Sequence, residues 1–193
     1  MGLFPRFGSR WFVVVRGVPL SRVHTVVESP YGVLTLVGES GRLVGLYMEG
    51  QRHRPAESSF GCRLEGAEAE PFGETVRQLG EYFAGRCDAF DLPLEFHGTE
   101  FQKRVWTALC DIPCGQTWTY GELARYIGCP TSARAVGLAN GKNPIGVIVP
   151  CHRVVGSDGS LTGYGGGLHR KRRLLDHERA LAGTSGAEQT AFF

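Results

Sequence analysis

Between residues 24 and 48, short runs of β-branched and aromatic residues alternate with clusters of turn-forming residues. The runs HTVVE, VLTLV and RLVGLYM are separated by SPYG and GESG. Gly, Pro and Ser clusters between such runs are typical of tight turns between strands. The pattern therefore predicts an antiparallel meander of three strands.

The next periodic segment, AEAEPFGETVRQLGEYFAG (67–85), has a helical rather than a strand period. Its apolar residues Phe72, Val76, Leu79 and Phe83 recur three or four positions apart. This spacing places them on one face of a helix and predicts an amphipathic helix. The segment that follows, AFDLPLEFHG, is typical of extended chain.

Two capping-box signatures predict helix starts in the second half of the chain. Thr99 with Gln102 precedes an apolar-periodic run, and Thr119 with Glu122 precedes the short segment YGELARYIG. A further short helix, SARAVGLAN, follows a tight turn that contains Gly and Pro. Two short helices joined by such a turn are typical of a helix-turn-helix.

The periodic pattern fades at both ends of the chain. Residues 1–20 have no clear period, and the last dozen residues are rich in Gly, Ala, Ser and Thr. With a boundary near residues 92–98, we divide the chain into four parts. These are an extension of unknown role (1–22), an N-terminal α/β domain (23–93), a C-terminal α domain (94–180) and a flexible tail (181–193).

The composition is that of a globular protein with a substantial core, at 193 residues, 42% hydrophobic and 21% charged. The apolar run WFVVV is too short to span a bilayer or to serve as a signal peptide, so we expect a cytoplasmic protein with no membrane partner. The six cysteines are expected to be reduced thiols. Because Cys110 and Cys114 have no matching second pair, we expect no metal site.

The net charge of +2 says little, but basic residues gather in one region. Between residues 125 and 173 there are eight Lys and Arg residues and one acidic residue, Asp158. Such a cluster is typical of a surface that binds a polyanion. The charge pattern slightly favours nucleic acid over a solvated face with scattered arginines.

The stretch IVPCHRVVG contains a candidate nucleophile, Cys151, at the end of an apolar run. A thiol attacks only as the thiolate, so it needs a proton acceptor or a positive field, and His152 and Arg153 are adjacent. Asp176 or Glu178 could fold back to fix the tautomer of the imidazole. The spacing alone leaves open that Cys151 is a small buried hydrophobic residue.

The Gly-rich loop GSDGSLTGYGGG lacks the Lys-Ser/Thr of a phosphate-binding P-loop and does not match the dinucleotide fingerprint. We therefore expect no nucleotide cofactor. The loop is better interpreted as one where a bulky group approaches the backbone, with Tyr164 as an aromatic wall.

Small residues are concentrated in the helix SARAVGLANG, which includes Ala133, Ala135 and Gly137. Small side chains would let the helix approach a narrow surface such as the DNA minor groove, which is about 6 Å wide. Arg134 would then project from the middle of that surface. Tight packing between helices remains the alternative interpretation.

Taken together, these residues resemble the methylated-DNA–protein-cysteine methyltransferases, DNA repair proteins that act on 6-O-methylguanine. Pro-Cys-His-Arg at 150–153 is the most specific motif. Arg-Ala-Val-Gly at 134–137, Asn-Pro at 143–144, Tyr-Gly-Glu at 120–122 and Gly-Tyr at 163–164 support it in the same order along the chain. The similarity extends over about residues 23–180.

The resemblance implies a small ribonuclease H-like N-terminal domain followed by a winged helix-turn-helix C-terminal domain. It implies a monomer that binds the minor groove of double-stranded DNA carrying 6-O-alkylguanine. The alkyl group would pass to Cys151 in one irreversible turnover that restores guanine. No cofactor is implied, because DNA is the donor and the protein is the acceptor.

The resemblance also implies roles for individual residues. His152 would deprotonate Cys151 through a bound water, Glu178 would orient His152, and Asn143 would steady the active-site turn. Tyr120 would donate a hydrogen bond to the departing guanine.

Two further residues would serve DNA recognition: Tyr164 would line the pocket, and Arg134 would fill the gap left by the extruded nucleotide. A base inside the stack hides its O6 substituent, so extrusion is required.

The sequence departs from some relatives at Gly165, which cannot supply the side-chain hydroxyl that they have there. This difference favours a wider pocket and larger alkyl groups. Nor do the His and Cys residues of the N-terminal half match the structural zinc site of some relatives.

Two other functions fit parts of the sequence. A lesion-binding module without transfer would resemble relatives that have Trp at the position of Cys151, so the cysteine argues against it. A Cys-His hydrolase would leave the basic segment and Arg134 unexplained.

Overall fold

The computed structural model describes residues 22–66 and 72–188, and it describes the side chains of the last helix as far as Gly183. All but the last residue of the predicted extension lies outside the described residues. The same is true of residues 67–71, where the first predicted helix begins, and of residues 189–193 in the predicted tail.

The predicted meander is present as the centre of a four-stranded sheet with the order β3-β2-β1-β4. The strands are β1 (Val23–Val27), β2 (Leu34–Glu39), β3 (Arg42–Met48) and β4 (Cys62–Arg63). β1, β2 and β3 pair in antiparallel fashion, whereas β4 adds in parallel to β1. A short 3-10 helix, Glu57–Ser59, precedes β4.

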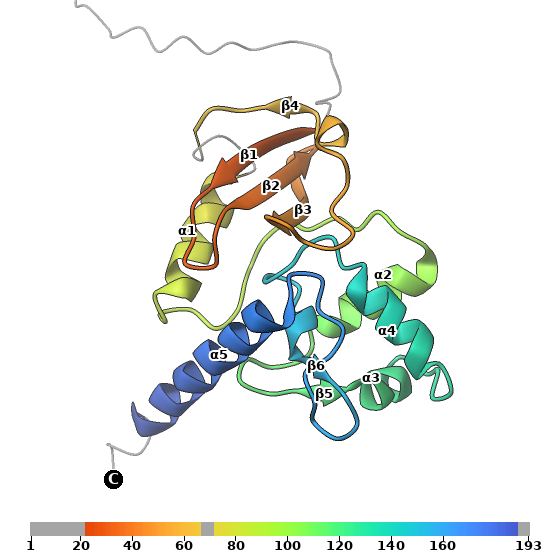
Figure 1. Cartoon of the computed structure of the whole chain (residues 1–193). Coiled ribbons are helices and arrows are strands. Elements are labelled where there is room, and N and C mark those ends of the chain that lie inside the picture. Colours follow the sequence, from red (N-terminus) through yellow and green to blue (C-terminus); the bar gives the residue numbers. More distant parts are fainter. Residues whose placement is uncertain (1–21, 67–71, 189–193) are drawn as a thin grey trace, which may run out of the picture.

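Helix α1 (Phe72–Phe83) lies beside this sheet (Figure 1). Phe72 and Leu79 are buried and Val76 and Phe83 are half-buried, as the helical period predicts, and Tyr82, which that period did not mark, is buried as well. The ring of Phe83 lies 5.3 Å from that of Tyr31 in the turn between β1 and β2, which fixes one end of α1 against the sheet.

The second half of the chain is mainly helical (Figure 1). Its elements are α2 (Glu100–Leu109), β5 (Trp118–Thr119), α3 (Tyr120–Tyr126), α4 (Ala133–Gly141), a 3-10 turn (Cys151–Arg153), β6 (Val154–Val155) and α5 (Leu168–Glu188). Both predicted capping boxes are present, at Thr99 and at Thr119. β5 and β6 form a separate, parallel two-stranded sheet.

Helix α5 continues to Glu188, although we predicted that a flexible tail begins at residue 181. The segment contains Gly183 and Gly186, which lower helix propensity. Adding a residue to an existing helix is much easier than starting one, so the preceding turns carry the helix beyond the predicted end.

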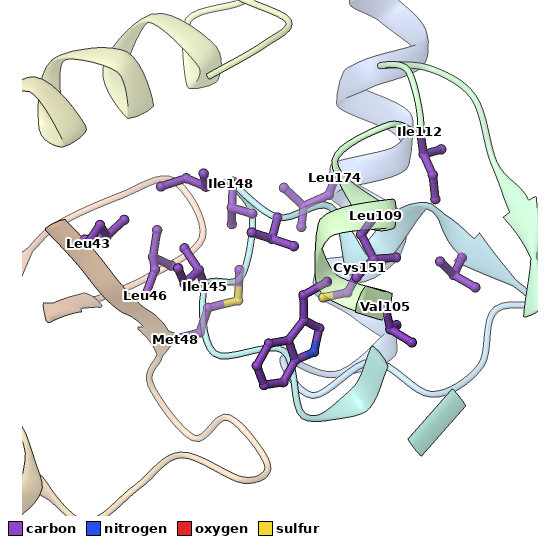
Figure 2. Packing of buried hydrophobic residues seen from close by; sticks show 14 of the residues in the cluster. Leu43, Leu46, Met48, Val105, Leu109, Ile112, Ile145, Ile148, Cys151 and Leu174 are labelled. Atoms are coloured by element: carbon purple, nitrogen blue, oxygen red, sulfur yellow. The ribbon is translucent and has the colours of Figure 1, made fainter. Parts of the chain in front are cut away.

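A continuous hydrophobic core joins the two halves of the molecule. Figure 2 shows Leu43, Leu46 and Met48 of β3 facing Ile145 and Ile148, which precede Cys151. Backbone hydrogen bonds connect the same segments, since the Leu46 N–H donates to Pro144 O (2.9 Å) and Leu46 O accepts from the Gly146 N–H (3.1 Å). The edge of the N-terminal sheet therefore positions the segment that carries the candidate nucleophile.

Among the helices that the structure describes, none has the length and apolar content that a membrane span requires.

Candidate active site

The segment before Cys151 is a buried turn held by one side chain. The Asn143 amide nitrogen donates to Val149 O (2.8 Å), and its amide oxygen accepts from the Ile145 N–H (3.0 Å). Val147 lies between them with a φ of 70°, a conformation that costs a β-branched residue energy. Asn143 thus satisfies backbone groups at both ends of a strained turn.

Cys151 begins the 3-10 turn and is only 6% exposed. Burial raises the pKa of its thiol, and the Asn143 amide and the Lys171 charge offset part of this effect. The thiol is therefore protonated at neutral pH, and a nucleophilic role requires a base.

His152 is fully buried, and its Nε2 lies 2.8 Å from Oε1 of Glu178. Burial lowers the pKa of the imidazole in spite of the opposing effect of Glu178, so the neutral form prevails at pH 7. An ionised carboxylate can only accept, so Nε2 carries the hydrogen and Nδ1 carries the lone pair. Nδ1 has no hydrogen-bond partner among the described residues, which leaves it able to accept a proton.

Glu178 is the centre of a buried hydrogen-bond network. Its carboxylate accepts from Tyr82 Oη (2.8 Å) and from two guanidinium nitrogens of Arg153 (2.8 Å each), in addition to His152. Burial alone would raise the pKa of Glu178, but the hydrogen bonds from His152 and Arg153 and the charge of Arg153 outweigh it and hold the pKa well below its usual range. The carboxylate is therefore ionised whenever the protein is folded near neutral pH.

The geometry of α5 decides which of the two candidate carboxylates reaches His152. Lys171, Leu174 and Glu178 are buried, and their spacing places them on one helix face. Asp176 lies on the exposed face, where it pairs with Arg179 at 2.9 Å. Helical spacing therefore provides the signal that distinguishes Glu178 from Asp176.

Lys171 occupies the same buried face, although its charge alone suggests a surface residue. Its ammonium donates to the carbonyls of Val154 and Thr162. Burial lowers its pKa to about 8, with Cys151 acting in the opposite direction. Lys171 thereby ties the strand after Cys151 to the Gly-rich loop.

Two tyrosines lie beside that loop. Tyr120 donates its hydroxyl hydrogen to Thr162 O (3.2 Å), and burial raises its pKa. A Cβ at Gly163, where φ is +65°, would lie 2.6 Å from the Tyr120 hydroxyl, so only glycine fits there. Burial raises the pKa of Tyr164 well above its ordinary value, and its ring meets the His152 imidazole edge-on with centroids 6.5 Å apart.

A small cavity borders Cys151 and Tyr164, and Asn143 and Gln51 also line it. The centre of a water molecule can move within about 10 Å³ of this cavity. This is about the space that one water molecule needs.

The outer face of α4 contrasts with this enclosed site. Arg134 and Ala135 are exposed, and Ala133 and Gly137 are half-buried. Leu138 is 65% exposed, a feature that the sequence analysis did not single out. A Cβ at Gly137 would lie 3.6 Å from the Tyr120 ring, so the face adjoins the start of α3.

Comparison with known proteins places this architecture in a family. The ribonuclease-like domain of 6-O-methylguanine DNA methyltransferase matches residues 23–96, and the DNA binding domain of the same family matches residues 100–180. The chain belongs to the 6-O-methylguanine DNA methyltransferase family. The predicted resemblance is therefore confirmed, as is the division into an N-terminal ribonuclease-like and a C-terminal DNA-binding part.

Individual relatives are similar over most of their length. The methylated-DNA–protein-cysteine methyltransferase of Mycolicibacterium paratuberculosis is 52% identical over 156 residues, 81% of this chain and 92% of that protein. The protein of the same name from Methanosarcina acetivorans is 49% identical over 80% of this chain and 97% of its own. The crystal structure of Mycobacterium tuberculosis OGT in complex with DNA aligns with a TM-score of 0.76 at 49% identity, covering 82% of this chain and 94% of that one.

Within this methyltransferase fold, the basic residues of the second half divide into two groups. Arg153 and Lys171 are buried, and Arg170 and Arg173 donate to backbone carbonyls near Tyr31. The others are exposed, namely Arg125, Arg134, Lys142 and Arg172. The charge count therefore overestimates the number of residues free to contact a polyanion, because half of them stabilise the fold.

Sequence reasoning missed several residues of this candidate site. Tyr82 and Arg153 bind Glu178, and Gln51 lines the cavity from the N-terminal half. Arg153 was considered only as a charge next to Cys151, and nothing in the periodicity of the first 90 residues marks Tyr82 or Gln51.

Proposed function

We propose that this protein repairs DNA by moving the alkyl group of 6-O-alkylguanine to Sγ of Cys151 in a single irreversible turnover. One observation carries the proposal. Cys151 is followed directly in the chain by a neutral histidine whose Nε2 is bound to an ionised, fully buried carboxylate and whose Nδ1 has no partner among the described residues. The relatives named above are methylated-DNA–protein-cysteine methyltransferases.

The transfer forms a bond between Sγ and the alkyl carbon and breaks the bond between that carbon and O6 of guanine. Nδ1 of His152 takes the thiol proton through a bound water, and Glu178 stabilises the charged imidazole that results. Asn143 keeps the turn in place during the attack. Tyr120 donates a hydrogen bond to the departing guanine, and the proton lost by Cys151 balances the one that guanine takes up.

Recognition rests on α3 and α4, which form a winged helix-turn-helix, with α4 in the minor groove of double-stranded DNA. Ala133, Ala135 and Gly137 let α4 approach the narrow groove. The alkylated nucleotide rotates out of the stack toward Tyr164 and Cys151, at a cost of a few kcal/mol. Arg134 fills the gap and offsets part of that cost, and the protein acts as a monomer.

The experiment that tests the proposal compares the wild type with Cys151→Ala on an oligonucleotide that carries isotopically labelled 6-O-methylguanine. We expect the variant to bind the oligonucleotide as the wild type does and to acquire no label. Loss of binding together with loss of transfer would mean that Cys151 is structural. Label on the variant would assign the acceptor to another residue.

A further inference from the structure

The cavity beside Cys151 is not built by the C-terminal half alone. Gln51, in the loop that follows β3, lines it together with Tyr164, Gly165 and Gly166 of the Gly-rich loop. Met48, the last residue of β3, contacts the hydroxyl of Tyr164 through its sulfur at 3.9 Å. The N-terminal half therefore contributes directly to the space that surrounds the thiol.

Two hydrogen bonds to Met48 fix the position of Gln51. The side-chain oxygen of Gln51 accepts from the Met48 N–H (3.0 Å), and the backbone N–H of Gln51 donates to Met48 O (3.1 Å). The Arg52 N–H then donates to Gly165 O (2.8 Å), which joins this loop to the Gly-rich loop. Gln51 is thus held in a tight turn, and its neighbour Arg52 is bonded to Gly165, which also lines the cavity.

Residues of the N-terminal half fill the space beside two glycines of the Gly-rich loop. A Cβ at Gly165 would lie 3.3 Å from Arg52 O and 3.6 Å from Cγ of Gln51. A Cβ at Gly166 would lie 2.8 Å from Sδ of Met48. The expectation that Gly165 widens the pocket is therefore not supported, because the N-terminal loop takes up the space that a side chain would use.

We propose that Gln51 determines which alkyl groups the site accepts, by limiting the cavity at Cys151 to groups about the size of methyl. The inference rests on the proposed function. A larger group must displace the Gln51 side chain and break its hydrogen bond to the Met48 N–H. Replacing Gln51 with a smaller residue removes that side chain and opens the cavity toward solvent.

The test measures single-turnover rates on oligonucleotides that carry 6-O-methylguanine or 6-O-benzylguanine. For Gln51→Ala we expect the ratio of the benzyl rate to the methyl rate to rise about tenfold, within the range that small changes of pocket size produce. Gln51→Met keeps the side-chain length and lacks the amide, so its ratio should stay close to that of the wild type.

Glu49→Ala provides the matched control, because Glu49 is exposed in the same loop and does not line the cavity. An unchanged ratio in Gln51→Ala would overturn the inference while leaving the proposed function intact. An equal rise in Gln51→Met and Gln51→Ala would also overturn it, since loop position rather than side-chain size would then control selectivity. A wild type that transfers neither group would overturn the proposed function itself.

Discussion

The site around Cys151 and the outer face of α4 use side chains in opposite ways. Around Cys151, the polar side chains of Glu178, Arg153 and Lys171 are buried and bonded to one another or to backbone carbonyls. On α4, Arg134 and Leu138 are exposed, and neither side chain makes a hydrogen bond or ion pair within the described parts of the chain. Substituting a buried polar residue also affects the residues that are bonded to it, whereas substituting an exposed residue without partners affects that residue alone.

Stability and recognition are therefore separable in this fold. Removing one member of a buried ion pair leaves the other uncompensated and costs about 3–5 kcal/mol. Substituting an exposed residue with no partner usually changes stability by less than about 0.5 kcal/mol. Variants of the buried network should therefore lose stability and activity together, and variants of the α4 face should lose only DNA-dependent function.

The largest expected effect is that of Glu178→Gln. The variant leaves Arg153 and His152 without a charged partner, and we expect it to lower the free energy of unfolding by about 3 kcal/mol. Urea unfolding at pH 7 measures the change, with Asp176→Asn as the control on the exposed face of α5. Similar values for the two variants would contradict the contrast between buried and exposed carboxylates.

The stability of the same variant should also depend on pH. The folded pKa of Glu178 lies well below its usual range, so its contribution is complete above the unfolded pKa of about 4.3 and is lost as the pH falls toward the folded value. The stability difference between wild type and Glu178→Gln should therefore shrink below about pH 4, by about 1 kcal/mol per pH unit. Denaturant titrations at pH 7 and pH 3.5 measure the difference, and a constant value would mean that Glu178 has an ordinary pKa in the folded protein.

A smaller loss is expected for Lys171→Met. The buried carbonyls of Val154 and Thr162 lose their donor, which costs about 1–3 kcal/mol, while the cost of burying the ammonium is removed. Arg172→Met changes an exposed neighbour on the same helix and serves as the control. Thermal unfolding of both variants measures the effect. Equal melting temperatures for the two variants would mean that the buried hydrogen bonds of Lys171 do not stabilise the fold.

The smallest effect on stability is expected for Arg134→Ala, which should unfold like the wild type. It should slow repair in double-stranded DNA about tenfold more than in single strands, because only a duplex has a gap to fill. Single-turnover rates on the two substrates measure this, with Lys142→Ala as the control for loss of a positive charge near α4. Equal slowing on both substrates would exclude Arg134 from the gap-filling role.

Local features were predictable from the sequence because they depend on near neighbours. The meander and the capping boxes at Thr99 and Thr119 rest on residues a few positions apart, and the structure contains them. Cys151 and His152 were recognisable because their motif is contiguous. The resemblance already pointed to Glu178, whereas residue spacing alone left Glu178 and Asp176 as alternatives until the buried face of α5 was known.

The remaining features depend on how distant segments pack. Lys171 and Arg153 look like surface charges in the sequence, and tertiary packing alone buries them. Tyr82 reaches Glu178 across 96 residues, a separation over which periodicity carries no information. The effect of Gly165 on the pocket was misjudged because the loop that fills the space beside it comes from the other half of the chain.

The most direct test of the central claim is the mass of the protein after incubation with excess oligonucleotide carrying 6-O-methylguanine, followed by peptide mapping. We expect a gain of one methyl group per chain, located on Cys151, and no further gain with longer incubation. A methyl group on another residue, repeated turnover without a change in protein mass, or binding with no gain at all would contradict it.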